Sequence, residues 1–143
     1  MPKKFTAATA DKYVLYRKPR HFREDFCGTC LLSSHWILAN KNNTAEAYDI
    51  DPEPLTWGLK NNIKPLGNKA KRLTQYQEDA RNPSRQAPDV RCAQNFSYWV
   101  FKKRAEMLDY FIGVQKDLAN DGIFVIDLHG GPESIQELEE ETV

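Results

Sequence analysis

The sequence predicts an α/β domain built on a mainly parallel sheet, because short apolar stretches alternate with longer segments of helical periodicity. The run Ile123 to Ile126 is apolar without alternation, which is typical of a strand buried on both faces. The clearest helix, Lys102 to Ala119, places apolar residues three and four positions apart. We therefore expect a sheet of about five strands flanked by helices.

Local signals set the bounds of each expected element. The carboxylate of Asp51 can cap a helix, and Pro52 fits the first helical position, so a helix starts there. Pro65 and Gly67 end it, and 79–88 is a polar loop. Strands are expected at 21–26, 45–50, 71–76, 90–96 and 123–126, and helices at 30–40, 51–64 and 102–119.

Composition narrows the class of protein. The 143 residues fit a single domain, 1–143, and equal numbers of basic and acidic residues, 20 each, give no field that favours nucleic acid. The sequence has no secretory signal and nothing near the ~20 apolar residues of a membrane span. Three cysteines do not suggest a disulfide framework. A cytoplasmic protein without a membrane partner is expected.

Polar side chains stand where the expected strands end. In parallel sheets, ligands bind beyond the carboxyl ends of the strands. There, the turn around Gly28 lets a ligand approach the backbone. Asp49, which closes the second strand, is placed to accept hydrogen bonds from ribose hydroxyls, and Asp79 from an adenine amino group. Each carboxylate alone is most often a helix cap, but together they suit a nucleoside-bearing ligand.

These motifs resemble those of a bacterial class I S-adenosylmethionine (SAM)-dependent methyltransferase family. The resemblance implies a Rossmann-like fold, SAM as the cofactor, and methyl transfer to an acceptor that the motifs do not identify. It covers roughly residues 11–133. The segments that carry it, in order, are 23–29, 49–55 with 57–59, 95–98, and 127–128 with 130–133.

The resemblance gives roles to residues of the first motif. Glu24 corresponds to the acidic residue that anchors the amino-acid end of the cofactor, and Gly28 to the central glycine of the usual glycine-rich turn. Phe26 and Cys30 occupy the outer glycine positions of that turn. Arg23 is either a partner for the methionine carboxylate or a surface residue.

Four later residues also receive roles from the resemblance. Asp49 corresponds to the ribose-binding carboxylate, and Ile50 is expected to pack on the adenine face. Asp79 corresponds to the adenine-side carboxylate, and Asn95 lies where the fourth strand faces the methionine portion. No catalytic base and no metal ligand is implied. The aromatic residues that follow Asn95 are expected in the core or at a dimer surface.

The family is longer than this chain, which leaves little room for a helix before His21 and stops ten residues after Glu133. Its sheet has seven strands in the order 3-2-1-4-5-7-6, so we expect a fold that is incomplete after the fifth strand. An unpaired sheet edge favours a homodimer. A non-catalytic remnant of a methyltransferase is therefore an alternative.

Other classes of protein remain open. Cys27 and Cys30 form a C-x-x-C motif at a strand-to-helix junction, where thioredoxin-like oxidoreductases place their redox pair. The same cysteines with His35, and with His21, Cys92 or His129, are weaker zinc candidates, because no second closely spaced pair follows. A nicotinamide-binding domain is disfavoured by the single glycine of the turn.

Overall fold

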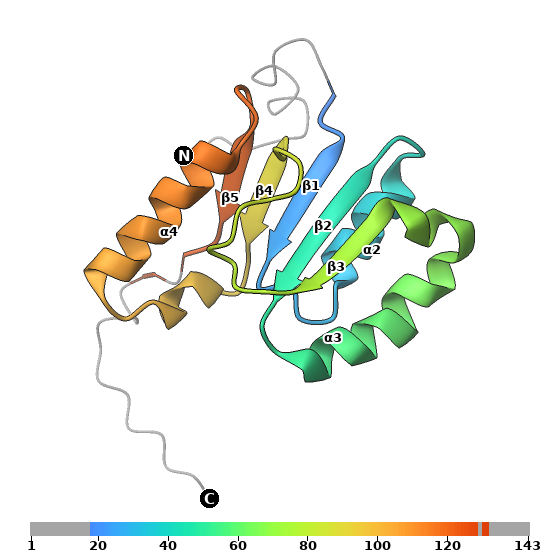
Figure 1. The fold of residues 1–143 in the computed structure, drawn as a ribbon, viewed down its shortest axis with the longest axis horizontal. Helices are drawn as coiled ribbons and strands as arrows, with labels where there is room; N and C mark the ends of the chain where they lie inside the picture. Colours follow the sequence, from blue (N-terminus) through green and yellow to red (C-terminus); the bar gives the residue numbers. More distant parts are fainter. Residues whose placement is uncertain (1–17, 129, 132–143) are drawn as a thin grey trace, which may run out of the picture.

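The computed structural model describes residues 18–128 and 130–131. Their sheet has five strands, all parallel, in the order β3-β2-β1-β4-β5 (Figure 1). This arrangement confirms the predicted Rossmann-like α/β fold, and its order is that expected for the first five strands of the class I sheet. The strands are β1 (His21–Asp25), β2 (Thr44–Asp49), β3 (Leu73–Gln77), β4 (Val90–Ala93) and β5 (Ile123–Ile126).

Helices cover the two faces of the sheet unequally (Figure 1). α2 (Leu31–Ala39) and α3 (Pro52–Gly58) pack on one face, and α4 (Arg104–Asp117) packs on the other. A loop, 78–89, joins β3 to β4 where a loop was predicted at 79–88, and it crosses the α4 face of the sheet. None of the helices in the described part of the chain has the length and apolar character of a membrane span.

Two predicted bounds were wrong because of local backbone geometry. After α3 the chain continues through a π-helical turn (Leu59–Ile63) and a 3-10 segment (Lys64–Arg72) that is kinked at Gly67, so β3 begins at Leu73 and not at 71. β4 ends at Ala93 and does not reach 96, because the next residues turn through the left-handed region of φ.

The α2 face of the sheet is mostly apolar, with Glu24 as an exception, whereas much of the opposite face is charged. Because side chains alternate along a strand, Phe22 packs beneath α2 while its neighbour Arg23 points to the other face. Arg23 pairs in register with Glu46 on β2 and with Arg91 on β4. All three charged side chains are buried. A layer of buried charge therefore lies between the sheet and the 78–89 loop.

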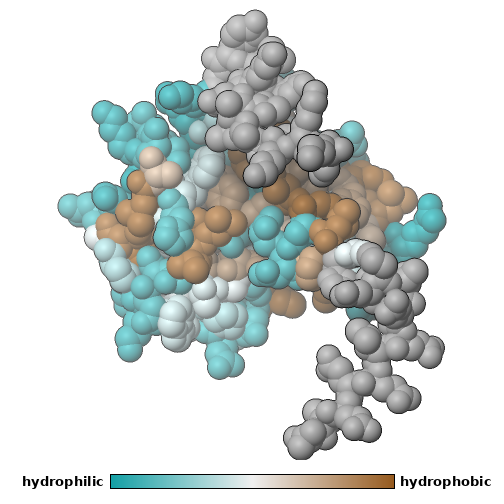
Figure 2. All heavy atoms as spheres, turned by 180° about the vertical axis from the view of Figure 1, so that it is seen from behind, coloured by the Kyte–Doolittle hydropathy of each residue, from teal (hydrophilic) through white to brown (hydrophobic). Residues whose placement is uncertain are grey.

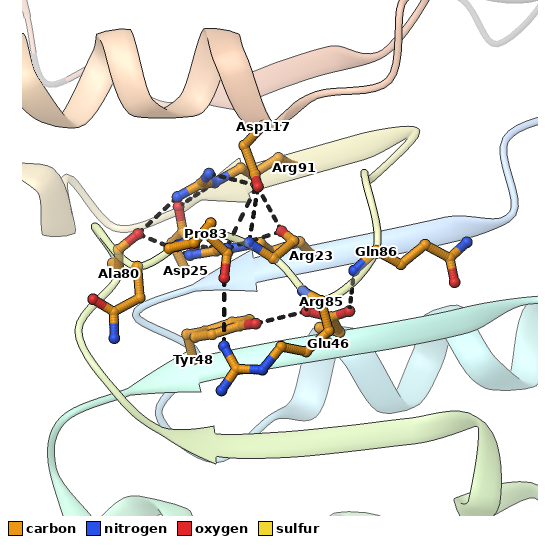
Figure 3. Close-up of polar contacts among 12 residues, drawn as sticks. Arg23, Asp25, Glu46, Tyr48, Ala80, Pro83, Arg85, Gln86, Arg91 and Asp117 are labelled. Carbon is orange, nitrogen blue, oxygen red and sulfur yellow. Dashed lines mark hydrogen bonds and ion pairs between the residues drawn. The ribbon is translucent and has the colours of Figure 1, made fainter.

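This charged layer holds the loop by its main chain (Figure 3). Arg23 and Arg91 both donate to the carbonyl oxygen of Ala80, at 2.8 and 2.7 Å. The Nε atoms of the two arginines donate to opposite oxygens of the buried Asp25 carboxylate, each at 2.7 Å. Asp117, at the end of α4, accepts from Arg91 at 2.8 Å. These paired charges hold the loop against this face of the sheet, whereas helices cover the other face by apolar packing.

β5 does not have the double burial that its apolar sequence predicted. Phe124 packs in the cluster beneath α4, but Ile123 and Val125 on the opposite face are 44% and 41% exposed. The reason is that α2 and α3 cover β1 to β3 and do not reach β5. Figure 2 shows apolar surface on this reverse side of the molecule. Homodimerisation through this region stays a prediction.

Candidate functional site

A cavity of about 530 Å³ lies at the carboxyl ends of the central strands. Three of the residues proposed from sequence, Asp49, Ile50 and Asp79, lie in its wall. They come from the ends of β2 and β3, which are neighbours in the sheet. The full lining is Phe26, Tyr48, Asp49, Ile50, Asp51, Asp79, Ala80, Arg81, Val100, Phe101 and Glu106.

The turn after β1 follows a path that suits glycine, although it contains only one. Phe26, Gly28 and Cys30 all have left-handed φ angles, of 54°, 51° and 57°. A side chain in this region costs roughly 1–2 kcal/mol, so two of the three positions are strained. Burial offsets that cost: Phe26 packs against the rings of Phe101 and Tyr110, and Cys30 is fully buried. The strained positions are the ones assigned from sequence to the outer glycines.

Asp49 ties this turn to the end of β2. Its Oδ2 accepts the backbone N–H of Gly28 at 2.8 Å, and its Oδ1 accepts that of Asp51 at 3.0 Å. An ionised carboxylate oxygen has two acceptor sites, so each oxygen can take a further donor from the cavity. Ile50, the next residue, is 66% exposed and presents an apolar surface beside it.

Asp79 is paired with Arg81, two residues along the same loop. The Nε and Nη2 atoms of Arg81 donate to its two oxygens at 3.0 and 2.6 Å. These hydrogen bonds lower the pKa of the Asp79 carboxyl, so it is ionised at neutral pH. The arginine lies above the ring of Phe101, with 5.2 Å between the guanidinium carbon and the ring centroid.

Glu24 lies outside the cavity lining. Its side chain points toward α2, where it accepts the backbone N–H of Ser33 at 2.9 Å and the hydroxyl of the same residue. Burial raises the pKa of Glu24 to about 7. The structure therefore brings two of the three predicted carboxylates, Asp49 and Asp79, to one cavity and places the third under the turn.

Asn95 is likewise absent from the lining. It is exposed, and its backbone N–H donates to Oδ2 of Asp127 at 2.8 Å. The N–H of Phe96 donates to the other oxygen at 3.0 Å. Asp127, which follows β5, thus holds a turn with two left-handed residues, at φ angles of 57° and 52°.

Arg23 has neither of the two roles considered for it. It is fully buried, with its side chain hydrogen-bonded to Asp25, Ser84 and the carbonyl of Ala80. It is therefore not a surface residue, and it does not line the cavity. Its contribution is to fix the loop that carries Asp79.

The cysteines do not have the environment of a redox pair. Cys27 and Cys30 are free, buried thiols with their sulfur atoms 3.5 Å apart. The hydrogen bond with Cys30, together with burial, raises the pKa of Cys27, which disfavours a thiolate. Within residues 18–128 and 130–131, no three potential metal ligands of the His, Cys, Asp and Glu types gather. His129 lies outside the described residues.

Several lining residues were not expected from sequence. Arg81 belongs to a polar loop, and nothing in its neighbours distinguishes it from Arg85, whose side chain pairs with Glu78. Phe101 was predicted in the core or at a dimer surface, and it is buried in the cluster beneath α4, but its place in the cavity wall was not predicted. Glu106 is one of several charges on α4. The only available signal was position: Arg81 follows Asp79 by two residues, within reach of its carboxylate.

Comparisons with protein-family models and with curated protein sequences found no match. Solved structures do match. The glycopeptide N-methyltransferase MtfA superposes with a TM-score of 0.70 at 14% identity, over 94% of this chain and 57% of its own. A SAM-dependent methyltransferase from Clostridium acetobutylicum gives 0.67 at 19% identity, over 83% and 46%. CalS10, a SAM-bound amino pentose methyltransferase from Micromonospora echinaspora, gives 0.67 at 18% identity, over 89% and 50%.

At these identities the similarity is one of fold. This chain spans between 37% and 57% of the lengths of eight of the solved structures that match it. The matched part includes the all-parallel sheet of this chain. The chain therefore has the fold of the SAM-dependent methyltransferases, over the first five strands of the class I sheet.

Proposed function

We propose that this chain binds SAM in the cavity at the carboxyl ends of β1 to β3, and that it is the cofactor-binding core of a methyltransferase. The observation that carries the proposal is that Asp49 and Asp79 both line the cavity of about 530 Å³, with the exposed Ile50 between them in sequence. Acceptors for hydroxyl and amino donors, beside an apolar surface, suit an adenosine group.

In this proposal the predicted residues act in two ways. Asp49 accepts the ribose hydroxyls, Ile50 packs on the adenine face, and Asp79 accepts the adenine amino group. Glu24 and Gly28 shape the turn that faces the amino-acid end of the cofactor. For Gly28 this means donating to Asp49, and for Glu24 it means holding the start of α2 through Ser33.

Asn95 is proposed to act at the methionine end of the cofactor. Its exposed turn, held by Asp127, follows β4, which lies beside β1 in the sheet. Bound SAM supplies a methyl group already activated by the sulfonium charge, so the protein has mainly to orient donor and acceptor. We assign none of the residues that line the cavity as a general base.

Titration calorimetry with SAM, S-adenosylhomocysteine and NAD tests the proposal. Both adenosyl ligands should bind and NAD should not, because the turn presents no second glycine to a pyrophosphate. Heat from NAD alone, or from no ligand, would refute it. Binding of SAM without methyl transfer to amine or hydroxyl acceptors would favour the alternative of a non-catalytic remnant.

The thiol oxidoreductase alternative has its own test. Buried thiols with a raised pKa react slowly with disulfide reagents at neutral pH. Ellman titration of the native protein from pH 6 to 9 should therefore be slow throughout, and fast only after unfolding. A thiol that reacts rapidly at pH 6 in the folded protein would support redox chemistry at Cys27 and Cys30.

A further inference from the structure

Arg81 fixes the orientation of the Asp79 carboxylate in the cavity wall. Its side chain donates to both oxygens, through Nε to Oδ1 and through Nη2 to Oδ2, which is the bidentate geometry of strong arginine–carboxylate pairs. Its backbone N–H also donates to Oδ1, at 2.8 Å. The hydrogen bonds on Asp79 are thus uneven: Oδ1 takes two donors and Oδ2 takes one.

The Asp79–Arg81 pair keeps both a hydrogen-bond donor and a hydrogen-bond acceptor for a ligand. A guanidinium has five N–H groups, of which Asp79 uses two, and each carboxylate oxygen has two acceptor sites. Within the described residues, the second N–H of Arg81 Nη2 and the second acceptor site of Asp79 Oδ2 make no hydrogen bond to another protein group. Because Nη2 and Oδ2 are 2.6 Å apart, a donor and an acceptor stand side by side.

The surrounding structure holds this edge in place before any ligand binds. The guanidinium lies over the Phe101 ring, and the carboxylates of Glu106 and Asp109 add to the attraction of Asp79 for it. Between the two paired residues, the carbonyl of Ala80 is clamped by the two buried arginines, Arg23 and Arg91 (Figure 3). The pair is therefore preorganised, although its side chains are 36% and 47% exposed.

Adenine presents the complementary edge. Its 6-amino group is a donor, and the adjacent ring nitrogen N1 is an acceptor. Hypoxanthine reverses both, with an acceptor oxygen at position 6 and a donor N1–H. We propose that the Asp79–Arg81 pair reads this edge, with Oδ2 of Asp79 accepting from the amino group and Nη2 of Arg81 donating to N1. Arg81 is then a specificity-determining residue of the SAM site, an inference that rests on the proposed function.

Calorimetry with S-adenosylhomocysteine and S-inosylhomocysteine at pH 7 tests the inference. The wild-type protein should favour the adenosyl ligand about tenfold or more, as a matched pair of base-edge hydrogen bonds does elsewhere. Arg81→Ala should reduce the preference to within about threefold, chiefly by weakening the adenosyl ligand. Arg81→Lys, with one donor and no fork, should be intermediate. Arg85→Ala, on the same loop but outside the cavity, should keep the wild-type preference.

The outcomes separate this inference from the proposed function. An unchanged preference in Arg81→Ala, in a protein that still binds S-adenosylhomocysteine, overturns the role of Arg81 and leaves the proposed function standing. A wild-type protein that binds neither ligand overturns both. The melting temperature of each variant shows whether it is folded, and Arg81→Lys keeps the test open if the alanine variant is not.

Discussion

Glu24 and Ser33 form a closed contact between the end of β1 and the first turn of α2, in which one carboxylate oxygen accepts both the backbone N–H and the hydroxyl of the serine. Because the carboxyl is buried, its pKa rises from 4.5 to about 7. The protonated form is favoured in the folded state, so this group stabilises the fold fully below pH 4.5. That contribution is lost as the pH rises to 7.

Glu24→Gln should therefore flatten the pH dependence of stability. Glutamine keeps an acceptor oxygen for Ser33 but carries no charge. The stability of the variant relative to wild type should therefore increase between pH 5 and 7. The gain should be on the order of 3 kcal/mol at pH 8, since one pKa unit corresponds to about 1.4 kcal/mol. Urea unfolding at pH 5, 6, 7 and 8 measures it. Glu53→Gln, at an exposed position, controls for the loss of one charge, and parallel curves for wild type and Glu24→Gln would contradict the prediction.

Asp49→Ala should weaken SAM binding by ~1–3 kcal/mol, because two ribose hydroxyls lose their shared acceptor. Asp49→Asn keeps one acceptor oxygen and should fall between the alanine variant and wild type. Calorimetry gives the dissociation constants, and urea unfolding separates loss of contact from loosening of the turn that Asp49 holds through Gly28. An unchanged dissociation constant in a folded alanine variant would rule out the ribose contact.

Arg91→Met should be among the most destabilising changes in the chain, costing about 3–5 kcal/mol. The side chain is buried and pairs with Asp25 and Asp117, so methionine leaves the buried Asp25 and the partly buried Asp117 short of a partner. Urea unfolding at pH 7 measures the loss. Arg85→Met, an exposed arginine with a surface ion pair to Glu78, should change stability by less than about 1 kcal/mol. Equal effects of the two variants would mean that the buried layer adds nothing.

Two glycine-to-alanine changes should have opposite effects on the stability of the fold. A Cβ at Gly58 would lie 2.2 Å from the backbone oxygen of Thr29, so α3 would have to move away from the β1 turn, at a cost of about 1–3 kcal/mol or more. A Cβ at Gly113, inside α4, meets nothing within 4 Å and should stabilise by about 0.5–1 kcal/mol. Thermal unfolding distinguishes them, and a stable Gly58→Ala would show that α3 is not packed on the turn.

We also propose that two copies associate through the edge beside β5. Sedimentation at several concentrations should then show a dimer for wild type. Val125→Lys places a charge on the exposed apolar face of that strand and should shift the equilibrium toward monomer. Lys116→Glu, on α4, is the control for a surface charge change. A wild-type protein that is monomeric at all concentrations removes this prediction.

The positions of Asp49, Ile50 and Asp79 were predictable because of a general property of parallel sheets. Their strands all point the same way, so residues that end neighbouring strands must meet at one edge. Hydrophobic patterning was enough to find those ends within a few residues. The start of β3 was harder to predict, because the kinked segment around Gly67 extends to Arg72 and has no apolar repeat that marks its end.

The charged layer could not be predicted in the same way. Strand β1 has polar residues on both faces, so its sequence does not tell which face is buried. Arg23 is an unlikely core residue by type, and it is buried only because Asp25 and the distant Asp117 neutralise it. Arg81 could not be predicted for a comparable reason. Its position in the cavity wall depends on its contacts with Asp79 and Phe101, and a single sequence does not show which residues a loop side chain contacts.

The two arginines that reach the 78–89 loop both hold a main-chain oxygen, a group that every amino acid provides. This contact fixes the path of the main chain at Ala80 and requires a small side chain at that one position. It places no requirement on the type of side chain at positions 79 and 81. If the cavity binds a nucleoside as proposed, substitutions at 79 and 81 should alter which base it accepts while the scaffold beneath stays as it is, so this loop offers a short route to a different nucleoside preference.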